Sequence, residues 1–460
     1  MFRTRALAAA MALAFAGLAS PALALATATE AAKAPAESAE ARLHALFEAD
    51  WQRQLQDNPL MASYLGDRRY NARLPDLSPA AFERRAAALR ESLAALGRID
   101  RAALSPADQL NFDLYQRELR MDIEALAFPA RRLAVDQRGG PHLLAVQMAP
   151  ALRFETAADY ADWIARLRAY GTYVDQTIAL LREGIATGWV APRAVMQRVP
   201  AQIAAQRSAR PEDSSFYQPF LDISENLPAA ERDRLQAEGH AAVAGVVLPA
   251  LARLETFFNA EYLPACADSV ATGDLPDGRA YYDHLARRYT TTTLDAEQIH
   301  AIGLAEVARI RGEMEALRGE VGFTGDLAAF FEHLRTDPRF FHDDPQALLA
   351  EYRAISKRLD PELVKVFGKL PRTPYGVTPI PDAIAPDTTT AYYQRPSADG
   401  RRAGYYYVNL YQPGSRPRWE MMALSLHEAV PGHHLQIALA QEMPDQPMFR
   451  RQGGFTAFIE

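Results

Sequence analysis

The chain has 460 residues and a formal net charge of −7, and hydrophobic residues make up 49% of it. This balance is typical of a globular protein, so it excludes a fibre, a disordered chain and a bundle of membrane helices. The acidic charge and the lack of a basic run argue against nucleic acid as a partner. Cys266 is the single cysteine, which excludes an intramolecular disulfide.

Residues 1–28 have the order of parts typical of a secretory signal peptide. Two arginines lie in residues 1–5, an apolar run of about 14 residues follows, and Ser20-Pro21 precedes three small-x-small triplets. A bilayer-spanning helix needs roughly 20 residues, so a retained membrane anchor is the weaker alternative. No cysteine lies near the cleavage site, which excludes lipid attachment there. We expect cleavage between Leu25 and Thr29, a periplasmic or secreted protein, and no membrane partner after signal removal.

Residues 29–37 are expected to form a flexible lead-in, and residues 38–370 to form a helical domain. The clearest helix begins after Thr156, where Asp159 stands three residues on, as in a capping box. Gly184 and Gly188-Trp189 are expected to end this helix. Between these points apolar residues recur at steps of three and four on one helix face: Trp163, Leu167, Tyr170, Val174, Ile178, Leu181 and Ile185.

A second long helix is expected to begin at Asp295, with Gln298 placed to complete its cap. Its apolar stripe is Ile299, Ile302, Val307, Ile310, Met314 and Leu317. We expect both stripes to be buried in the core. Further helices fit residues 38–55, 79–96, 106–125, 229–262 and 345–366. The sequence therefore predicts a mainly α fold.

The pattern changes at residue 371, where residues 371–460 are expected to hold a small β element and the metal-binding helices. Five prolines fall within residues 371–386, which no helix interior tolerates. The run Gly-Tyr-Tyr-Tyr-Val-Asn-Leu at residues 404–410 follows an Asp-Gly turn signal and predicts a strand or hairpin arm. Helical pattern resumes at Trp419.

Three of the ten histidines lie within eight residues, in the segment Leu-His-Glu-Ala-Val-Pro-Gly-His-His-Leu-Gln at residues 426–436. Neutral imidazole is a favoured zinc ligand. A carboxylate beside the metal can take a proton from water and deliver it to the leaving amine. We therefore predict a zinc site with His427 as a ligand and Glu428 as the catalytic base and acid. The alternative is that these are ordinary surface or capping histidines, which a lone histidine would favour.

The spacing differs from the familiar His-Glu-x-x-His helix, in which histidines four residues apart share one face. The fourth residue after His427 is Pro431, and the next histidines follow six and seven residues after it. Proline breaks the helical ladder and glycine frees the backbone, so Pro431-Gly432 can form a kink or bulge. A bulge that holds two extra residues would bring His433 to the position that the second histidine has in the familiar motif, so we expect His433 to be the second ligand. His434 would need three, and we expect it to support the ligands from behind.

This segment resembles the bacterial family called domain of unknown function 885, together with the preceding Asp-Gly-Arg and Gly-Tyr-Tyr-Tyr-Val-Asn. The match extends upstream to Tyr262-Leu263-Pro264, Pro276-Asp277-Gly278, Tyr281-Tyr282 and the threonines at residues 290–293. The resemblance implies a mainly helical, gluzincin-like peptidase fold with a deep channel, similar to angiotensin-converting enzyme and thimet oligopeptidase. It also implies a further helix-rich segment after residue 460 with a transition-state tyrosine or histidine, so that residues 371–460 are an incomplete catalytic domain.

The same resemblance implies roles for further residues. The strand at residues 404–410 would form the edge of the cleft, where unpaired backbone groups align an extended peptide, with Tyr406 and Asn409 as substrate-binding candidates. The alternative is that this strand is only core β structure. A carboxylate from a following helix usually completes the zinc site in such folds. Glu460 suits that position, 27 residues after His433. Glu442 is the competing carboxylate, and the alternative is that Glu460 is only a terminal residue.

The sequence therefore predicts an exported Zn²⁺-dependent metallopeptidase that hydrolyses oligopeptides. A zinc amidase or esterase that acts on a non-peptide bond would use the same residues. The alternative from another class is a non-catalytic periplasmic binding protein with a vestigial metal helix. Glu428 argues against that alternative, because a structural zinc site closes its fourth position and needs no base.

Overall fold

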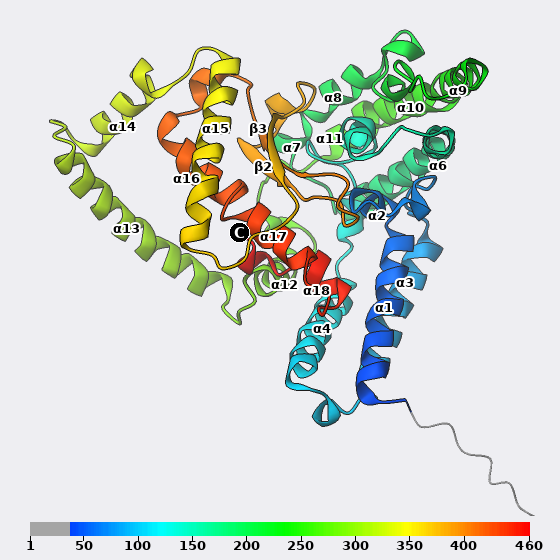
Figure 1. The fold of residues 1–460 in the computed structure, drawn as a ribbon, viewed down its shortest axis with the longest axis horizontal. Coiled ribbons are helices and arrows are strands. Elements are labelled where there is room, and N and C mark those ends of the chain that lie inside the picture. The colour runs from blue at the N-terminus through cyan, green and yellow to red at the C-terminus, as the bar shows by residue number, and fades with distance from the viewer. Residues whose placement is uncertain (1–36) are drawn as a thin grey trace, which may run out of the picture. The chain divides into compact units, whose positions relative to one another are not determined.

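The computed structural model describes residues 37–460, which form helices and one small sheet (Figure 1). The mainly helical fold that the sequence predicts is confirmed. The signal peptide expected at residues 1–28 and nearly all of the lead-in expected at residues 29–37 lie outside the described residues.

The first described helices are α1 (Ala39–Asp57), α2 (Pro59–Tyr64), α3 (Pro79–Leu96) and α4 (Pro106–Ala125). A core cluster that includes Leu43, Phe47, Leu96, Phe112 and Tyr115 joins α1, α3 and α4. Both α3 and α4 begin with proline after a serine N-cap, a combination that satisfies the first free N–H groups and presets the backbone. Their bounds match the prediction from the sequence because these start signals are local.

Helix α6 (Ala157–Thr187) runs through the main core cluster. Thr156 and Asp159 form the predicted capping box, and Gly188 ends the helix in the left-handed conformation with φ of 75°. Every residue of the predicted stripe is buried except Ile185, which packs at the edge of the cluster. The predicted start, stripe and end at Gly188 are confirmed, whereas Gly184 lies inside the helix and is buried.

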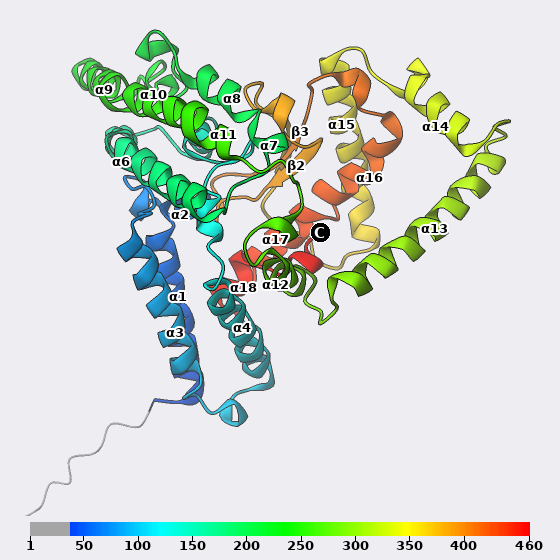
Figure 2. The same ribbon diagram turned by 180° about the vertical axis from the view of Figure 1, so that it is seen from behind.

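Three helices joined by π-helical turns form one continuous stretch, Ala229–Ala265, and the first two of them pack on α6 (Figure 2). They are α9 (Ala229–Ala242), α10 (Leu248–Phe257) and α11 (Leu263–Ala265). This stretch is long and apolar enough to cross a membrane, but 44% of its most apolar part is buried in the structure. The buried hydrophobic residues of this stretch belong to the main core cluster, which also contains the buried stripe of α6. The short helices α5 (Leu144–Met148), α7 (Arg193–Met196) and α8 (Val199–Gln206) complete this part.

A fully buried histidine in this part makes the stability of the fold depend on pH. His142 precedes α5, and its Nε2 lies 3.2 Å from Oε1 of Gln202 on α8. Burial lowers the pKa of His142 from 6.5 to about 4, although the charge of Asp136 opposes this shift. Between these pH values the unfolded chain binds a proton that the folded chain does not bind, so stability is lost as the pH falls from about 6.5 to about 4.

We expect His142→Gln to reduce this loss of stability by up to about 3 kcal/mol, the equivalent of a shift of this size. Urea unfolding of both proteins at pH 7 and pH 4.5 gives the comparison. The quantity to compare is the change in unfolding free energy between the two pH values, since the substitution also changes stability at neutral pH. An equal change in both proteins would show that His142 stays protonated when buried.

Helices α12 (Gly278–Thr290), α13 (Ala296–Glu320) and α14 (Leu327–Thr336) follow. The predicted capping box of Asp295 and Gln298 begins α13. The expectation that its apolar stripe lies in the core is wrong: no residue of α13 is buried, and Val307 is 65% exposed. Helical periodicity therefore predicts the helix correctly, but burial also needs a partner surface, which the described residues do not supply along α13.

The β element is a three-stranded sheet of β1 (Tyr375–Pro379), β2 (Ala391–Gln394) and β3 (Gly404–Val408). The strand order is β1-β3-β2, with β3 parallel to β1 and antiparallel to β2. The expectation that residues 404–410 form an edge strand is therefore wrong. The proline-rich segment supplies β1 as a second neighbour of β3, and its proline lies at the end of an edge strand, where it is tolerated.

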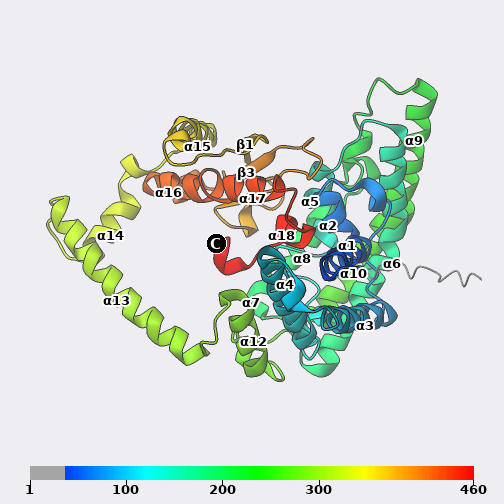
Figure 3. The same ribbon diagram turned by 60° about the horizontal axis from the view of Figure 1, so that its bottom comes forward.

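Helices α15 (Pro345–Leu359) and α16 (Arg418–Glu428) pack with the sheet in a second core cluster (Figure 3). Tyr352 of α15 meets Tyr406 of β3 edge to face, with ring centroids 5.7 Å apart. Met421 of α16 joins the same cluster. This packing fixes α16, which carries the first half of the histidine motif, against the sheet.

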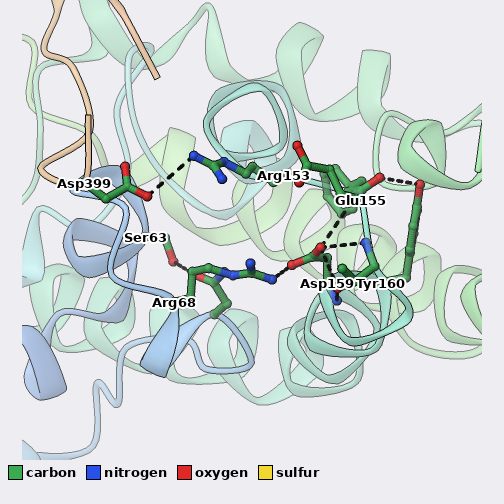
Figure 4. A network of polar contacts seen from close by, with 10 residues as sticks. Ser63, Arg68, Arg153, Glu155, Asp159, Tyr160 and Asp399 are labelled. Atoms are coloured by element: carbon green, nitrogen blue, oxygen red, sulfur yellow. Dashed lines mark hydrogen bonds and ion pairs between the residues drawn. The ribbon is translucent and has the colours of Figure 1, made fainter. Parts of the chain in front are cut away.

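A polar network holds the loop between β2 and β3 against the N-terminal helices (Figure 4). Arg153 forms an ion pair of 3.5 Å with Asp399 in that loop. Beside it, a separate ion pair joins Arg68, which follows α2, to Asp159 near the start of α6. The N–H of Ala398 donates a hydrogen bond of 2.8 Å to the carbonyl of Leu65. The loop that follows β2 is thereby fixed from outside the sheet.

Candidate metal centre

The histidine motif lies at a break between two helices. Helix α16 ends at Glu428, and α17 (His433–Gln441) begins at His433. The N–H of Gly432 donates to the carbonyl of Leu426, six residues back, at 2.9 Å. An α-helical bond spans four residues, so the break holds two residues more than a helical turn. The predicted break at Pro431-Gly432 is confirmed.

Glycine at position 432 is required by a close approach of the backbone. A Cβ added to Gly432 would lie 1.8 Å from the carbonyl oxygen of His427. The atoms that this Cβ would meet belong to the backbone of the same turn, so they cannot move away far enough to make room for a side chain. The tight turn between the two histidine-bearing helices therefore depends on this residue.

The turn brings together the side chains of His427, His433 and Glu460. Nε2 of His427 lies 3.5 Å from Oε2 of Glu460, and Nε2 of His433 lies 3.9 Å from Oε1 of Glu460. The two imidazole rings meet edge to face with centroids 4.4 Å apart. One donor atom from each of the three residues lies within 4.8 Å of the others, close enough to surround one ion.

Glu460 reaches this cluster from the segment after α18 (Met448–Gln452). The side-chain amide of Gln436 on α17 donates a hydrogen bond of 2.6 Å to the carbonyl of Phe458, which ties the last turn to the metal-motif helix. Glu442, the competing carboxylate, instead accepts hydrogen bonds from the backbone N–H groups of Arg372 and Thr373. Of the two candidates, only Glu460 lies at both His427 and His433.

Glu428, the expected base, is buried beside the cluster. Its Oε2 lies 3.9 Å from Nε2 of His433 and has no hydrogen-bond partner among the described residues. Burial and the nearby charge of Glu460 raise the pKa of Glu428 to about 7. Burial and the neighbouring His427 lower the pKa of His433, which favours the neutral ring, the form that binds a metal.

His434 points away from the cluster. Its Nδ1 lies 2.9 Å from the hydroxyl of Tyr393, and the ring also hydrogen-bonds to the backbone of Thr373. Burial lowers the pKa of His434 to about 4. Gly404 leaves room for this pair, because a Cβ there would lie 2.2 Å from the Tyr393 hydroxyl oxygen. The structure thus places His433 at the other candidate ligands and His434 behind them.

A cavity of about 570 Å³ adjoins the cluster. Besides His427, His433, Glu428 and Glu460, its lining includes Thr389, Thr390, Ala391, Tyr392, Tyr393, Arg138 and Arg395. Strand β2 and the residues before it, rather than β3, therefore line the cavity. β2 is an edge strand of the sheet.

The two residues expected to bind substrate do not line this cavity. Tyr406 is fully buried in the core against Tyr352. Asn409 is also buried, and its amide donates to the carbonyls of Ala385 and Thr389, at 2.8 and 3.0 Å. Their positions in the β3 segment made them candidates, but β3 is central and these two side chains point into the protein.

The cavity is also lined by residues that the sequence did not single out as site residues, among them Tyr393, Arg395 and Arg138. The aromatic pair Tyr392-Tyr393 was a usable signal, since aromatic residues favour strands and this pair forms half of β2. Neither arginine stands in a motif, and the chain contains many arginines. Only the tertiary structure brings residues 138 and 395, which are far apart in the sequence, to the lining of the same cavity.

The structure therefore has a mainly helical fold with a histidine–glutamate cluster at a helix break beside a small sheet. Residues 59–460 match the family model described as "Bacterial protein of unknown function (DUF885)", and the chain belongs to this family. The resemblance seen in the sequence is confirmed at this level.

Two solved structures share this fold. The first is described as "the putative lipoprotein from Colwellia psychrerythraea", with a TM-score of 0.83 and 22% identity over 92% of this chain and 76% of that chain. The second, "a putative lipoprotein of unknown function from Shewanella oneidensis", has a TM-score of 0.55 and 15% identity over 90% of this chain and 74% of that chain. A comparison with curated proteins found no match.

Proposed function

We propose that this protein is an exported zinc-dependent peptidase that hydrolyses peptide bonds in oligopeptides. Glu428 is the observation that carries the proposal. It is a buried carboxyl with an unpartnered oxygen, next to three convergent candidate ligands and on the wall of a cavity. A structural metal site has no use for such a group, and a vestigial binding protein would gain nothing from burying it.

The residues present fit a catalytic zinc ion. Two imidazoles and one carboxylate form a donor set that leaves a fourth position open. His427, His433 and Glu460 would hold the ion. When bound, zinc supplies Lewis acidity, which makes a water molecule more acidic and polarises a carbonyl group.

Glu428 then acts as the proton carrier of the reaction. Its carboxylate takes a proton from the attacking water as the C–O bond forms, and returns this proton to the leaving nitrogen as the C–N bond breaks. The carboxylate is regenerated at the end of the cycle.

The edge strand β2 favours peptides over other amides and esters. It lies along the cavity, and an edge strand offers backbone N–H and C=O groups to an extended chain. A zinc amidase or esterase would use the same ligands and base, but it would have no use for an edge strand.

Export is part of the proposal. It rests on the signal-peptide pattern of residues 1–28. The two similar structures belong to proteins described as putative lipoproteins, which fits an envelope location. In this chain no cysteine lies near the expected cleavage site, so we propose a released protein without a lipid anchor.

Metal analysis combined with a peptide digest tests the proposed function. The purified chain should contain about one zinc ion by mass spectrometry, as a single catalytic site requires. It should also cleave peptides from a defined oligopeptide mixture, lose this activity with a chelator, and regain it with Zn²⁺. A zinc-loaded chain that cleaves esters or non-peptide amides alone would support the amidase alternative. A chain that binds no zinc would refute the proposal.

A further inference from the structure

Arg395 is a half-buried cation on the wall of the metal-site cavity. It directly follows β2. Its side chain forms no ion pair with a described carboxylate, and its one hydrogen bond from the guanidinium goes to the backbone carbonyl of Gln452. Burial lowers the pKa of Arg395, as expected for a cation without a counter-charge. A guanidinium has five N–H donors, so most of those of Arg395 remain for a ligand.

A second cavity, of about 470 Å³, lies on the other side of Arg395. Arg395, Ile437 and Ile459 line both cavities, so the two meet at these side chains. The second cavity has largely apolar and aromatic walls, which include Trp51, Leu119, Phe449, Phe455 and Phe458.

The arginines that line the second cavity have no described carboxylate as partner, whereas its two acidic residues are each close to an arginine. On its α4 wall, Asp122 is paired with Arg288 at 2.7 Å, and Glu118 lies 3.8 Å from Arg117. Arg450 and Arg451 also line it, and both bond to uncharged oxygen atoms instead of a described carboxylate. The ligand that complements this cavity is therefore apolar with a negative charge near Arg395.

We propose that the two cavities together recognise the C-terminal residue of a peptide, with its α-carboxylate on Arg395 and a large apolar side chain in the second cavity. A C-terminal residue carries both groups on one Cα, which is what a cation at the mouth of an apolar cavity complements. Guanidinium and carboxylate form paired, charge-assisted hydrogen bonds. An acidic side chain is the other possible source of the carboxylate, but it would leave the apolar cavity without an occupant.

This inference rests on the proposed function and names its substrate class. The protein would act as a carboxypeptidase that removes large apolar C-terminal residues. Water adds across the last peptide bond, the C–N bond breaks, and a free amino acid leaves with the proton returned by Glu428.

Ligand binding to the metal-free chain tests the site without catalysis. The probes are N-acetyl-phenylalanine, its amide, and the α-amide of N-acetyl-glutamate. Calorimetry measures their affinities, and so does the change in fluorescence of Trp51, which lines the cavity. We expect the free acid to bind about 10- to 100-fold more tightly than its amide, the range for a hydrogen bond to a charged group. Arg395→Gln should remove this difference.

Arg358→Gln is the matched control, because Arg358 is an exposed arginine of α15 that lines neither cavity. It should bind all three probes like the parent chain. Equal binding of acid and amide, no binding of the acid, or unchanged binding by Arg395→Gln would each overturn the inference. Preference for the glutamate amide would assign Arg395 to acidic side chains and overturn the assignment to the α-carboxylate.

Cleavage of a matched peptide pair separates this inference from the proposed function. The two peptides end in phenylalanine and differ only in a free or amidated C-terminus. We expect the zinc-loaded chain to release phenylalanine from the free acid alone, and Arg395→Gln to lower kcat/KM about 10- to 100-fold, mainly through KM. Equal internal cleavage of both peptides would keep the peptidase and refute the inference. Arg395-dependent binding without any cleavage would keep the site and refute the peptidase.

Discussion

Replacing Glu428 with glutamine is expected to lower peptide turnover by about two to four orders of magnitude, the usual contribution of general acid–base catalysis. Glutamine keeps the size of the side chain but cannot carry a proton between water and the leaving nitrogen. Glu428 is not among the three convergent ligands, so bound zinc should be unchanged. Steady-state kinetics and metal analysis on the same preparation give both values.

Glu420→Gln is the control for this experiment. Glu420 lies exposed in the first turn of the same helix, α16, and does not line the metal-site cavity. Its substitution should leave turnover unchanged and shows the effect of charge loss on the helix alone. Full turnover by zinc-loaded Glu428→Gln would exclude Glu428 as the base.

Replacing His433 with alanine is expected to abolish most zinc binding, whereas His434→Ala should weaken it only about 10- to 100-fold, the range for a residue that supports ligands from behind. Nε2 of His433 lies 3.9 Å from Glu460, but the ring of His434 is engaged with Tyr393 and Thr373. Competitive titration against a chelating dye measures both affinities. Loss of zinc in His434→Ala alone would show that the assignment through the Pro431-Gly432 turn is wrong.

The same titration separates the two candidate carboxylates. Glu460→Ala should weaken zinc binding, because Glu460 lies at both histidines. Glu442→Ala should not, because Glu442 accepts hydrogen bonds from the backbone of the 372–373 segment. The side chain of Glu460 is 62% exposed, which limits the effect, because an exposed side chain is less firmly held in place.

Features set by neighbours within a few residues could be predicted from the sequence. The capping boxes at Thr156 and Asp295, and the proline starts of α3 and α4, each involve groups at most four residues apart. The break at Pro431-Gly432 is equally local, because it depends on a missing N–H and on a close backbone approach. These interactions form in any fold that the chain adopts, so pattern alone identifies them.

Features that need a distant partner could not be predicted in this way. The stripe of α13 has the same periodicity as that of α6, but only α6 meets a covering surface. Alternation along residues 404–408 shows that neighbouring side chains face opposite ways, but it does not show which face meets a cavity. Which strand lies beside the cavity depended on the pairing of β1 with β3, because this pairing made β3 central and left β2 at the edge of the sheet.

The candidate metal site divides along the same line. The sequence by itself determined the local set of candidate groups: His427, Glu428 and His433 lie in one short segment whose turn sets their spacing. The resemblance named Glu460 as the third candidate ligand but left Glu442 open, and the tertiary structure decided between them. Packing of α17 and α18 carries Glu460 to the histidines, and the fold brings Arg395 to the same cavity. Short-range geometry is encoded by adjacent residues, whereas a cavity is formed by side chains that meet only when distant segments pack.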